Sequence, residues 1–131
     1  NLNSFSCKII FSNMKQMIKN KQKHFGDWET RQQSSSFIPN KQRKKYCHGA
    51  IWLGEKKRFF NVCKDLKNNV EEDLKRGFIA KWHDESHLNY YACHNHVQWL
   101  NSRFSQWKNV SNRGVIFSVD KDNQKFHSTS L

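Results

Sequence analysis

The sequence predicts a mixed α/β fold, because apolar strand-like segments alternate with helical segments along the chain. Residues 48–53 are apolar and are closed by Gly54, as expected of a short buried strand. A helix is predicted next, with Gly77 placed to end it, because five apolar residues share one helical face: Phe59, Cys63, Leu66, Val70 and Leu74. The short apolar segment at residues 78–80 then predicts another strand over residues 78–81, and a second helix is predicted over residues 85–94.

Three further segments complete the predicted organisation. An amphipathic helix is expected over the second decade of the chain, where apolar residues recur at helical spacing between lysines: Ile9, Ile10, Met14, Met17 and Ile18. Residues 40–45 (Asn-Lys-Gln-Arg-Lys-Lys) predict a basic linker, and residues 115–119 a late strand. With 131 residues and no internal repeat, the chain allows one domain or a piece of a larger one. Because it begins with Asn1 rather than Met, we expect a fragment or a processed product.

The chain is strongly basic, since 23 Lys and Arg against 11 Asp and Glu give a formal charge of +12. This balance favours an anionic partner, such as nucleic acid, a phosphorylated ligand or an anionic membrane. The basic residues are spread along the chain and match no nucleic-acid-binding motif, so we expect a solvated basic surface and no nucleic-acid partner. No apolar stretch of the sequence is long enough to span a bilayer.

The four cysteines are widely scattered and form no Cys-x-x-Cys pair: Cys7, Cys47, Cys63 and Cys93. Cys93-His94-Asn95-His96, with Cys47-His48 as the other half, could hold zinc. Structural zinc ligands usually come in closely spaced pairs, which neither segment supplies. Scattered thiols are more often small buried apolar groups. The sequence therefore assigns no metal ligand in this chain.

Residues 82–89 (Trp-His-Asp-Glu-Ser-His-Leu-Asn) are the most informative stretch of the chain. They follow the predicted strand at residues 78–81, and ligands bind at the carboxyl ends of strands in α/β folds. A carboxylate of Asp84 or Glu85 can act there as base, acid or nucleophile, and the indole of Trp82 offers a flat apolar face to a sugar or a base. The pattern fits a structural alternative equally well, in which Asp84 caps the helix that follows and Trp82 is buried.

The stretch at residues 82–89 is similar to the signature of the retaining α-1,3-galactosyl- and N-acetylgalactosaminyltransferases, the family of the histo-blood-group A/B enzymes and the α-1,3-galactosyltransferases. Two further blocks resemble this family in the right order: Trp28-Glu29-Thr30-Arg31, with Ser34 and Phe37-Ile38-Pro39, and Tyr46-Cys47-His48-Gly49-Ala50-Ile51-Trp52-Leu53-Gly54. The similarity runs from about Phe25 to Gln124. It implies that residues 25–131 are the C-terminal part of a GT-A (Rossmann-like) glycosyltransferase domain, and that residues 1–24 are a poorly matched leader.

The resemblance implies transfer of galactose or N-acetylgalactosamine from a UDP-sugar to a glycan acceptor on a glycolipid or glycoprotein, with retention of configuration. Glu85 takes the family's catalytic position, as nucleophile or as stabiliser of an oxocarbenium-like state. Trp82 would stack on the acceptor. The implied donor-binding residues are the triplet His48, Gly49 and Ala50, together with His83, Asp84 and Lys121. A structural Glu85 and a close-packed strand at the triplet remain the alternatives.

The chain also departs from the family pattern. The family's manganese-binding Asp-x-Asp, expected well before the signature, is missing, and Asp120-x-Asp122 is interpreted as a chance match in a turn. Asp27 replaces a hydroxyl residue of the family. We therefore expect manganese, and a membrane anchor that places the domain in the Golgi lumen, only in the full-length protein. This chain alone is expected to be inactive. A degenerate relative that binds glycans without turnover is the alternative.

Overall fold

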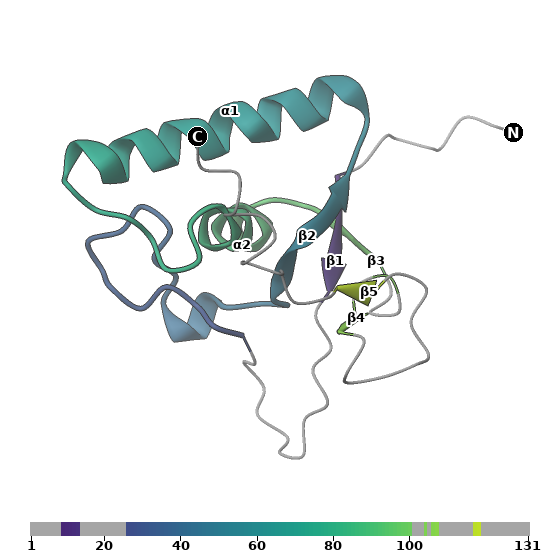
Figure 1. Cartoon of the computed structure of the whole chain (residues 1–131), viewed down its shortest axis with the longest axis horizontal. Coiled ribbons are helices and arrows are strands. Elements are labelled where there is room, and N and C mark those ends of the chain that lie inside the picture. The colour runs from purple at the N-terminus through teal and green to yellow at the C-terminus, as the bar shows by residue number, and fades with distance from the viewer. Residues whose placement is uncertain (1–8, 14–25, 101–103, 105, 108–116, 119–131) are drawn as a thin grey trace, which may run out of the picture.

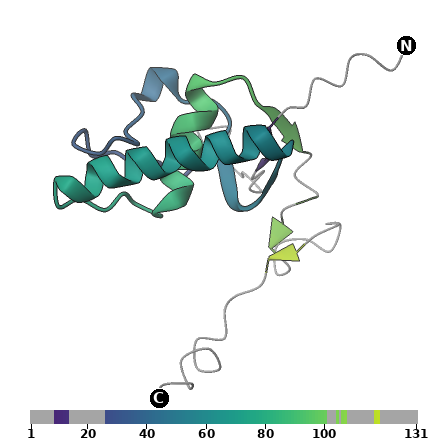
Figure 2. The same ribbon diagram turned by 90° about the horizontal axis from the view of Figure 1, so that it is seen from above.

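The computed structural model describes residues 9–13, 26–100, 104, 106–107 and 117–118 (Figures 1 and 2). Their order is β1 (Ile10–Asn13), the short 3-10 helix η1 (Asn40–Gln42), β2 (Cys47–Leu53), α1 (Lys56–Lys75), α2 (Asp84–His94), β3 (Gln98–Leu100), β4 (Gln106–Trp107) and β5 (Phe117–Ser118). Strands β4 and β5 pair in parallel. The mixed α/β architecture predicted from the sequence is confirmed, as are the strand at β2 and the helices at α1 and α2.

Strand β1 is the central strand of a three-stranded sheet of order β2-β1-β3. It runs antiparallel to β2 and parallel to β3, and its register against β2 shifts between Phe11 and Asn13. Ile9 and Phe11 are both buried, which is the two-residue period of a strand. The helix predicted over the second decade of residues is therefore wrong for Ile10–Asn13, and the rest of that segment lies outside the described residues.

The main core lies where the sheet meets the two helices. In Figure 1 α1 is seen lengthwise and α2 end-on, so the helices cross steeply. Aromatic side chains from β2, α1, α2 and β3 pack around this core. The core itself consists of six buried residues: Ile9, Phe11, Cys47, Val62, Leu88 and Ala92. Trp52 of β2 stacks on Phe59 of α1 with ring centroids 4.2 Å apart. Aromatic packing thus ties the start of α1 to the end of β2.

Helix α1 begins and ends with capping interactions. The side chain of Glu55 accepts a hydrogen bond from the backbone of Lys57 at the start. At the other end Gly77 has φ of +67°, and the amides of Gly77 and Phe78 donate to the carbonyls of Leu74 and Asp73. This pattern is a Schellman motif, which favours glycine because its φ is positive. The role predicted for Gly77 is confirmed.

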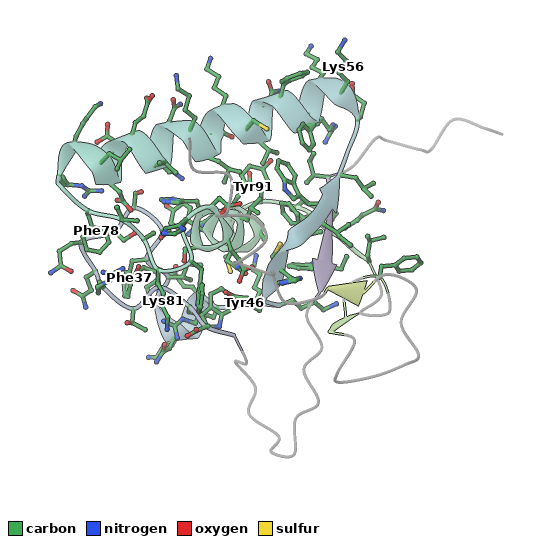
Figure 3. All side chains as sticks on the ribbon, viewed as in Figure 1. Phe37, Tyr46, Lys56, Phe78, Lys81 and Tyr91 are labelled. Carbon is green, nitrogen blue, oxygen red and sulfur yellow. The ribbon has the colours of Figure 1, made fainter. Side chains whose placement is uncertain are left out.

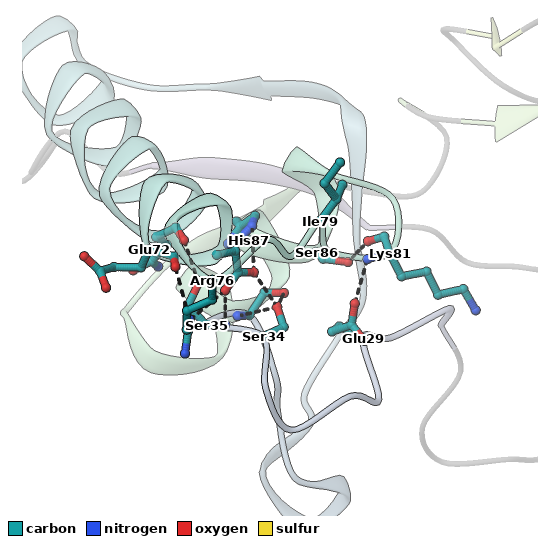
Figure 4. A network of polar contacts seen from close by, with 12 residues as sticks. Glu29, Ser34, Ser35, Glu72, Arg76, Ile79, Lys81, Ser86 and His87 are labelled. Atoms are coloured by element: carbon teal, nitrogen blue, oxygen red, sulfur yellow. Dashed lines mark hydrogen bonds and ion pairs between the residues drawn. The ribbon is translucent and has the colours of Figure 1, made fainter.

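The strand predicted at residues 78–81 is wrong, because residues 78–80 have no regular secondary structure and residues 81–83 form a turn (Figure 4). Side chains take the backbone groups that a neighbouring strand would have paired. Arg31 donates to the carbonyl of Ile79 at 3.1 Å, and Glu29 accepts from the amide of Lys81 at 2.6 Å. The hydroxyl of Ser86 donates to the Lys81 carbonyl. Side-chain hydrogen bonds of this kind replace a sheet ladder.

The turn contains two consecutive residues with positive φ, Trp82 at +57° and His83 at +47°. Neither is glycine, and such conformations cost about 1–3 kcal/mol each, so they persist only where neighbouring contacts hold them. The contacts of Glu29, Arg31 and Ser86 supply that support. Residues with strained backbone cluster at functional sites, which directs attention to this turn.

Helix α2 is fixed to β2 by one amide side chain. His83 is the N-cap of α2, so the capping role considered for Asp84 is wrong. Asn89 is fully buried, accepts from the Cys47 amide at 2.7 Å, and donates to the carbonyls of Cys47 at 2.9 Å and Glu85 at 2.8 Å. The side chain therefore joins the first turn of α2 to the start of β2.

We expect Asn89→Ala to destabilise the protein by about 3 kcal/mol or more, because a buried amide and two carbonyls each lose a partner. Asn95→Ala is the matched control, since the exposed Asn95 donates one hydrogen bond to the Tyr91 carbonyl. Urea unfolding of the full-length protein measures both variants. Equal losses for the two variants would contradict this role of Asn89.

A second expectation concerns Glu29, whose side chain is 1% exposed and pairs with Arg31 at 2.6 Å. Its hydrogen bonds with Arg31 outweigh burial and, with the Lys81 amide, lower the pKa of Glu29 from 4.5 to about 2. The stabilisation is therefore complete above pH 4.5 and is lost as the pH falls through about 2. It amounts to about 2–3 kcal/mol at neutral pH.

Glu29→Gln should accordingly lower the free energy of unfolding at pH 7, and the difference from wild type should shrink between pH 4.5 and pH 2. Glu71→Gln, at an exposed carboxylate on α1, is the control and should change stability by less than about 0.5 kcal/mol. Urea unfolding at pH 7, 4 and 2.5 measures this. A difference that stays constant with pH would contradict the ion-pair explanation.

Candidate active site

The carboxylate of Glu85 lies against the start of β2, and both of its oxygens are held there. One of the two donors is Tyr46, which precedes β2 and is labelled in Figure 3. The Tyr46 hydroxyl donates to Oε1 at 2.6 Å, and the Gly49 amide donates to Oε2 at 2.8 Å. Neither donor is a cation, so the side chain is oriented without being neutralised by either contact. A half-buried carboxylate held in this way can stabilise developing positive charge or attack an electrophilic carbon.

Tyr46 is a buried donor that the sequence did not single out for a role at the site. Its side chain lies edge-to-face against Trp28, with ring centroids 5.0 Å apart, and the residue is 4% exposed. Burial raises the pKa of Tyr46, and the hydrogen bond to Glu85 raises it further. The phenol therefore stays protonated and keeps donating across the physiological pH range. Such charge-assisted hydrogen bonds are short and strong.

The predicted donor triplet lies on β2 next to Glu85. A Cβ atom placed on Gly49 would lie 3.3 Å from both Cβ and Oε2 of Glu85. Glycine thus allows the carboxylate to reach the strand backbone. This close approach fits the alternative in which the triplet belongs to a close-packed strand. His48 is half-buried on the same strand. The structure therefore brings the predicted catalytic residue together with Gly49 of the predicted donor triplet.

Other residues of the signature line two pockets away from the contacts of Glu85 with β2. Asp84 and His83 are exposed and line a pocket of about 230 Å³ beside the end of α1, together with Asp73 and His87. Trp82 is 56% exposed, so the alternative of a buried tryptophan is wrong. It lines a more open pocket of about 600 Å³ with the turn and with Glu29, Thr30 and Arg31. Lys121 lies outside the described residues.

Asp73 of α1 is a buried acid that sequence reasoning did not single out. It accepts from the Ser34 hydroxyl at 2.7 Å and the Ser35 amide at 2.6 Å, and it pairs with Arg76 at 2.8 Å (Figure 4). Burial alone would raise the pKa of Asp73, but these hydrogen bonds lower it. His87 Nε2 lies 3.7 Å away, and burial lowers the pKa of His87. Asp73 could not be identified as a buried acid from the sequence, because no local pattern marks it and its partners Ser34 and Ser35 are distant in the sequence.

The cysteines in the described part of the chain are free thiols, with Cys47 and Cys93 buried and Cys63 half-buried. Burial raises the pKa of Cys47 and of Cys93. Among the described residues, no group of three or more His, Cys, Asp or Glu is placed to hold a metal ion. Neither helix that the structure describes is long and apolar enough to cross a membrane.

The sequence of the chain is similar to those of known glycosyltransferases. The family model of glycosyltransferase family 6 matches residues 8–119. The histo-blood group ABO system transferase 2 of Rattus norvegicus is 37% identical over 67 residues, which are 51% of this chain and 20% of that protein. The O-antigen biosynthesis glycosyltransferase WbnI of Escherichia coli is 31% identical over 78 residues, which are 60% of this chain and 33% of that protein.

A second rat relative, the histo-blood group ABO system transferase 1, is 33% identical over 67 residues, covering 51% of this chain and 19% of that protein. The chain thus spans between about a fifth and a third of the curated relatives it matches. The family model covers most of the chain, including β1, both helices and the site around Glu85. The chain belongs to glycosyltransferase family 6.

Proposed function

We propose that this chain supplies part of the active site of a retaining glycosyltransferase, which moves galactose or N-acetylgalactosamine from a UDP-sugar to a glycan acceptor. The observation that carries the proposal is the carboxylate of Glu85, held between the Tyr46 hydroxyl and the Gly49 amide. Family membership supports the reaction class, and the relatives named as transferases support it further.

Glu85 is proposed to act on the anomeric carbon of the donor. Retention requires a group on the sugar face opposite the leaving diphosphate, either to form a covalent intermediate or to stabilise an oxocarbenium-like state. Fixing both oxygens lowers the reorganisation needed as charge develops, which is how preorganised groups contribute to catalysis. Tyr46 and Gly49 supply this fixation.

We assign the predicted site residues to the two substrates. His48, Gly49 and Ala50 on β2 would contact the donor sugar, with His83 and Asp84 binding its hydroxyls and Lys121 approaching the diphosphate. The exposed indole of Trp82 would stack on the acceptor, since an indole face suits the apolar face of a pyranose ring. The acceptor is a glycan of a glycolipid or a glycoprotein.

Manganese is proposed only for the full-length protein. In the part of the chain that the structure describes, no group of three or more His, Cys, Asp or Glu is placed to hold a metal ion. We place the proposed manganese site elsewhere in the full-length protein. We also propose that the mixed α/β unit is the C-terminal part of a GT-A domain. Placement in the Golgi lumen, with a membrane anchor outside this chain, rests on the family resemblance.

Glu85→Gln in the full-length protein should lower sugar transfer by about 10²–10³-fold or more, because the isosteric amide cannot stabilise positive charge at the anomeric carbon. UDP binding should be nearly unchanged. Transfer rates and UDP calorimetry measure the two effects, with Glu71→Gln on α1 as the control. Turnover within a few-fold of wild type would remove Glu85 from the mechanism. A wild-type protein that binds a glycan without transfer would favour the degenerate relative.

Tyr46→Phe should keep the fold and lower the transfer rate by about 10–100-fold, because a hydrogen bond to a charged group contributes about 1.5–3 kcal/mol. The change removes one oxygen atom and leaves the ring against Trp28. Tyr91→Phe, at a half-buried tyrosine packed on the main core, is the matched control. Equal transfer rates for Tyr46→Phe and wild type would show that the hydroxyl does not contribute.

A further inference from the structure

Asp27 makes two contacts that reach across 54 and 55 residues of sequence. Its Oδ2 accepts a hydrogen bond from the indole nitrogen of Trp82 at 2.6 Å, and its Oδ1 pairs with the ammonium of Lys81. The family resemblance places a hydroxyl residue at this position, so the carboxylate is a feature of this chain. Neither contact has a part in the proposed chemistry at Glu85.

The two contacts hold the side chains of the turn, whereas the other interactions hold its backbone. Glu29 binds the Lys81 amide, Arg31 binds the Ile79 carbonyl and Ser86 binds the Lys81 carbonyl. Trp82 is 56% exposed, so packing alone leaves its side chain free to change rotamer. The bond to Asp27 fixes the indole edge and leaves the ring faces for a ligand.

The pocket beside Trp82 carries balanced charge. It has a volume of about 600 Å³ and is lined by residues that include Glu29, Arg31 and Lys81. Glu29 pairs with Arg31, and Lys81 pairs with Asp27, so each cation there has an acidic partner. A paired set of charges suits a neutral ligand with many hydroxyls, whereas an anionic ligand would need an unpaired cation.

We propose that Asp27 is a positioning residue for acceptor binding, which fixes the Trp82 indole so that one ring face meets a neutral pyranose. The proposal rests on the proposed function in taking the ligand of Trp82 to be the acceptor. Asp27 acts through Trp82 and Lys81 and touches neither the donor nor the anomeric carbon. Because the pair with Lys81 is exposed, its contribution to stability is small, and Asp27 variants should fold.

The first test is independent of activity and uses the full-length protein labelled with ¹⁵N-tryptophan. The indole N–H signal of Trp82 is identified by its disappearance in Trp82→Phe. Asp27→Ala should shift this signal and leave those of the other tryptophans in place, while Asp27→Asn should shift it less because the amide oxygen still accepts. The matched control is Glu72→Ala, which removes an exposed carboxylate paired with Lys75 on α1. An unchanged Trp82 signal in Asp27→Ala would overturn the proposal.

The second test separates acceptor binding from the donor reaction. Lactose is the neutral probe and 3′-sialyllactose the anionic one. Asp27→Ala should raise the acceptor KM for lactose about fivefold, as expected for loss of a partly exposed charge-assisted hydrogen bond. The rate of UDP-sugar hydrolysis without acceptor should change less than twofold. An unchanged lactose KM, or tighter binding of the sialylated probe by wild type, would overturn the proposal.

The two proposals fail in different ways. If wild type catalyses no transfer, but binds lactose and loses about fivefold in affinity in Asp27→Ala, then the proposed reaction fails and the positioning role stands. If wild type transfers sugar and the Asp27→Ala variant has the wild-type acceptor KM, the positioning role fails alone. A wild type that binds no neutral sugar overturns the role of Asp27.

Discussion

The arrangement of the site depends on one carboxylate that joins the first turn of α2 to the start of β2. Glu85 is held by the Tyr46 hydroxyl and the Gly49 amide, and Asn89, one helical turn later, bonds both backbone groups of Cys47. These contacts bring α2 against the strand without a covalent link or a cation. Because Gly49 has no side chain, the carboxylate of Glu85 reaches the strand backbone, and this contact both builds the fold and fixes the orientation of Glu85.

The start of the signature, at Trp82 and His83, is supported by a different segment of the chain. Residues 27–31 hold the turn at residues 79–82 through backbone and side-chain contacts, while Asp73 ties the end of α1 to Ser34 and Ser35. The strained backbone at Trp82 and His83 is maintained by these contacts, so the signature is a preorganised structure rather than a free loop. Glu85 and Trp82 therefore lie in separate places that different contacts support.

Local patterns predicted the elements that local interactions determine. The apolar face and Gly77 define α1, and the apolar run at β2 is long enough to be recognised. Short apolar stretches are ambiguous, which explains why β1 was predicted as a helix and residues 78–81 as a strand. In both cases residues distant in the sequence determine the local structure. Strand β1 forms because it pairs with β2 and β3. Residues 79–81 are held by hydrogen bonds from Arg31 and to Glu29. The catalytic role predicted for Glu85 came from the family resemblance, whereas the hydrogen bond from Tyr46 to Glu85 could be found only in the three-dimensional structure.

A structure of the full-length protein with UDP-2-deoxy-2-fluorogalactose tests the central claim most directly, because the fluorine slows reaction and retains the donor. We expect a carboxylate oxygen of Glu85 within about 3.5 Å of the anomeric carbon, on the face opposite the diphosphate. The bonds from Tyr46 and Gly49 should remain in place. A donor whose anomeric carbon faces another residue, with Glu85 still bound to β2 and remote from the sugar, would contradict the account.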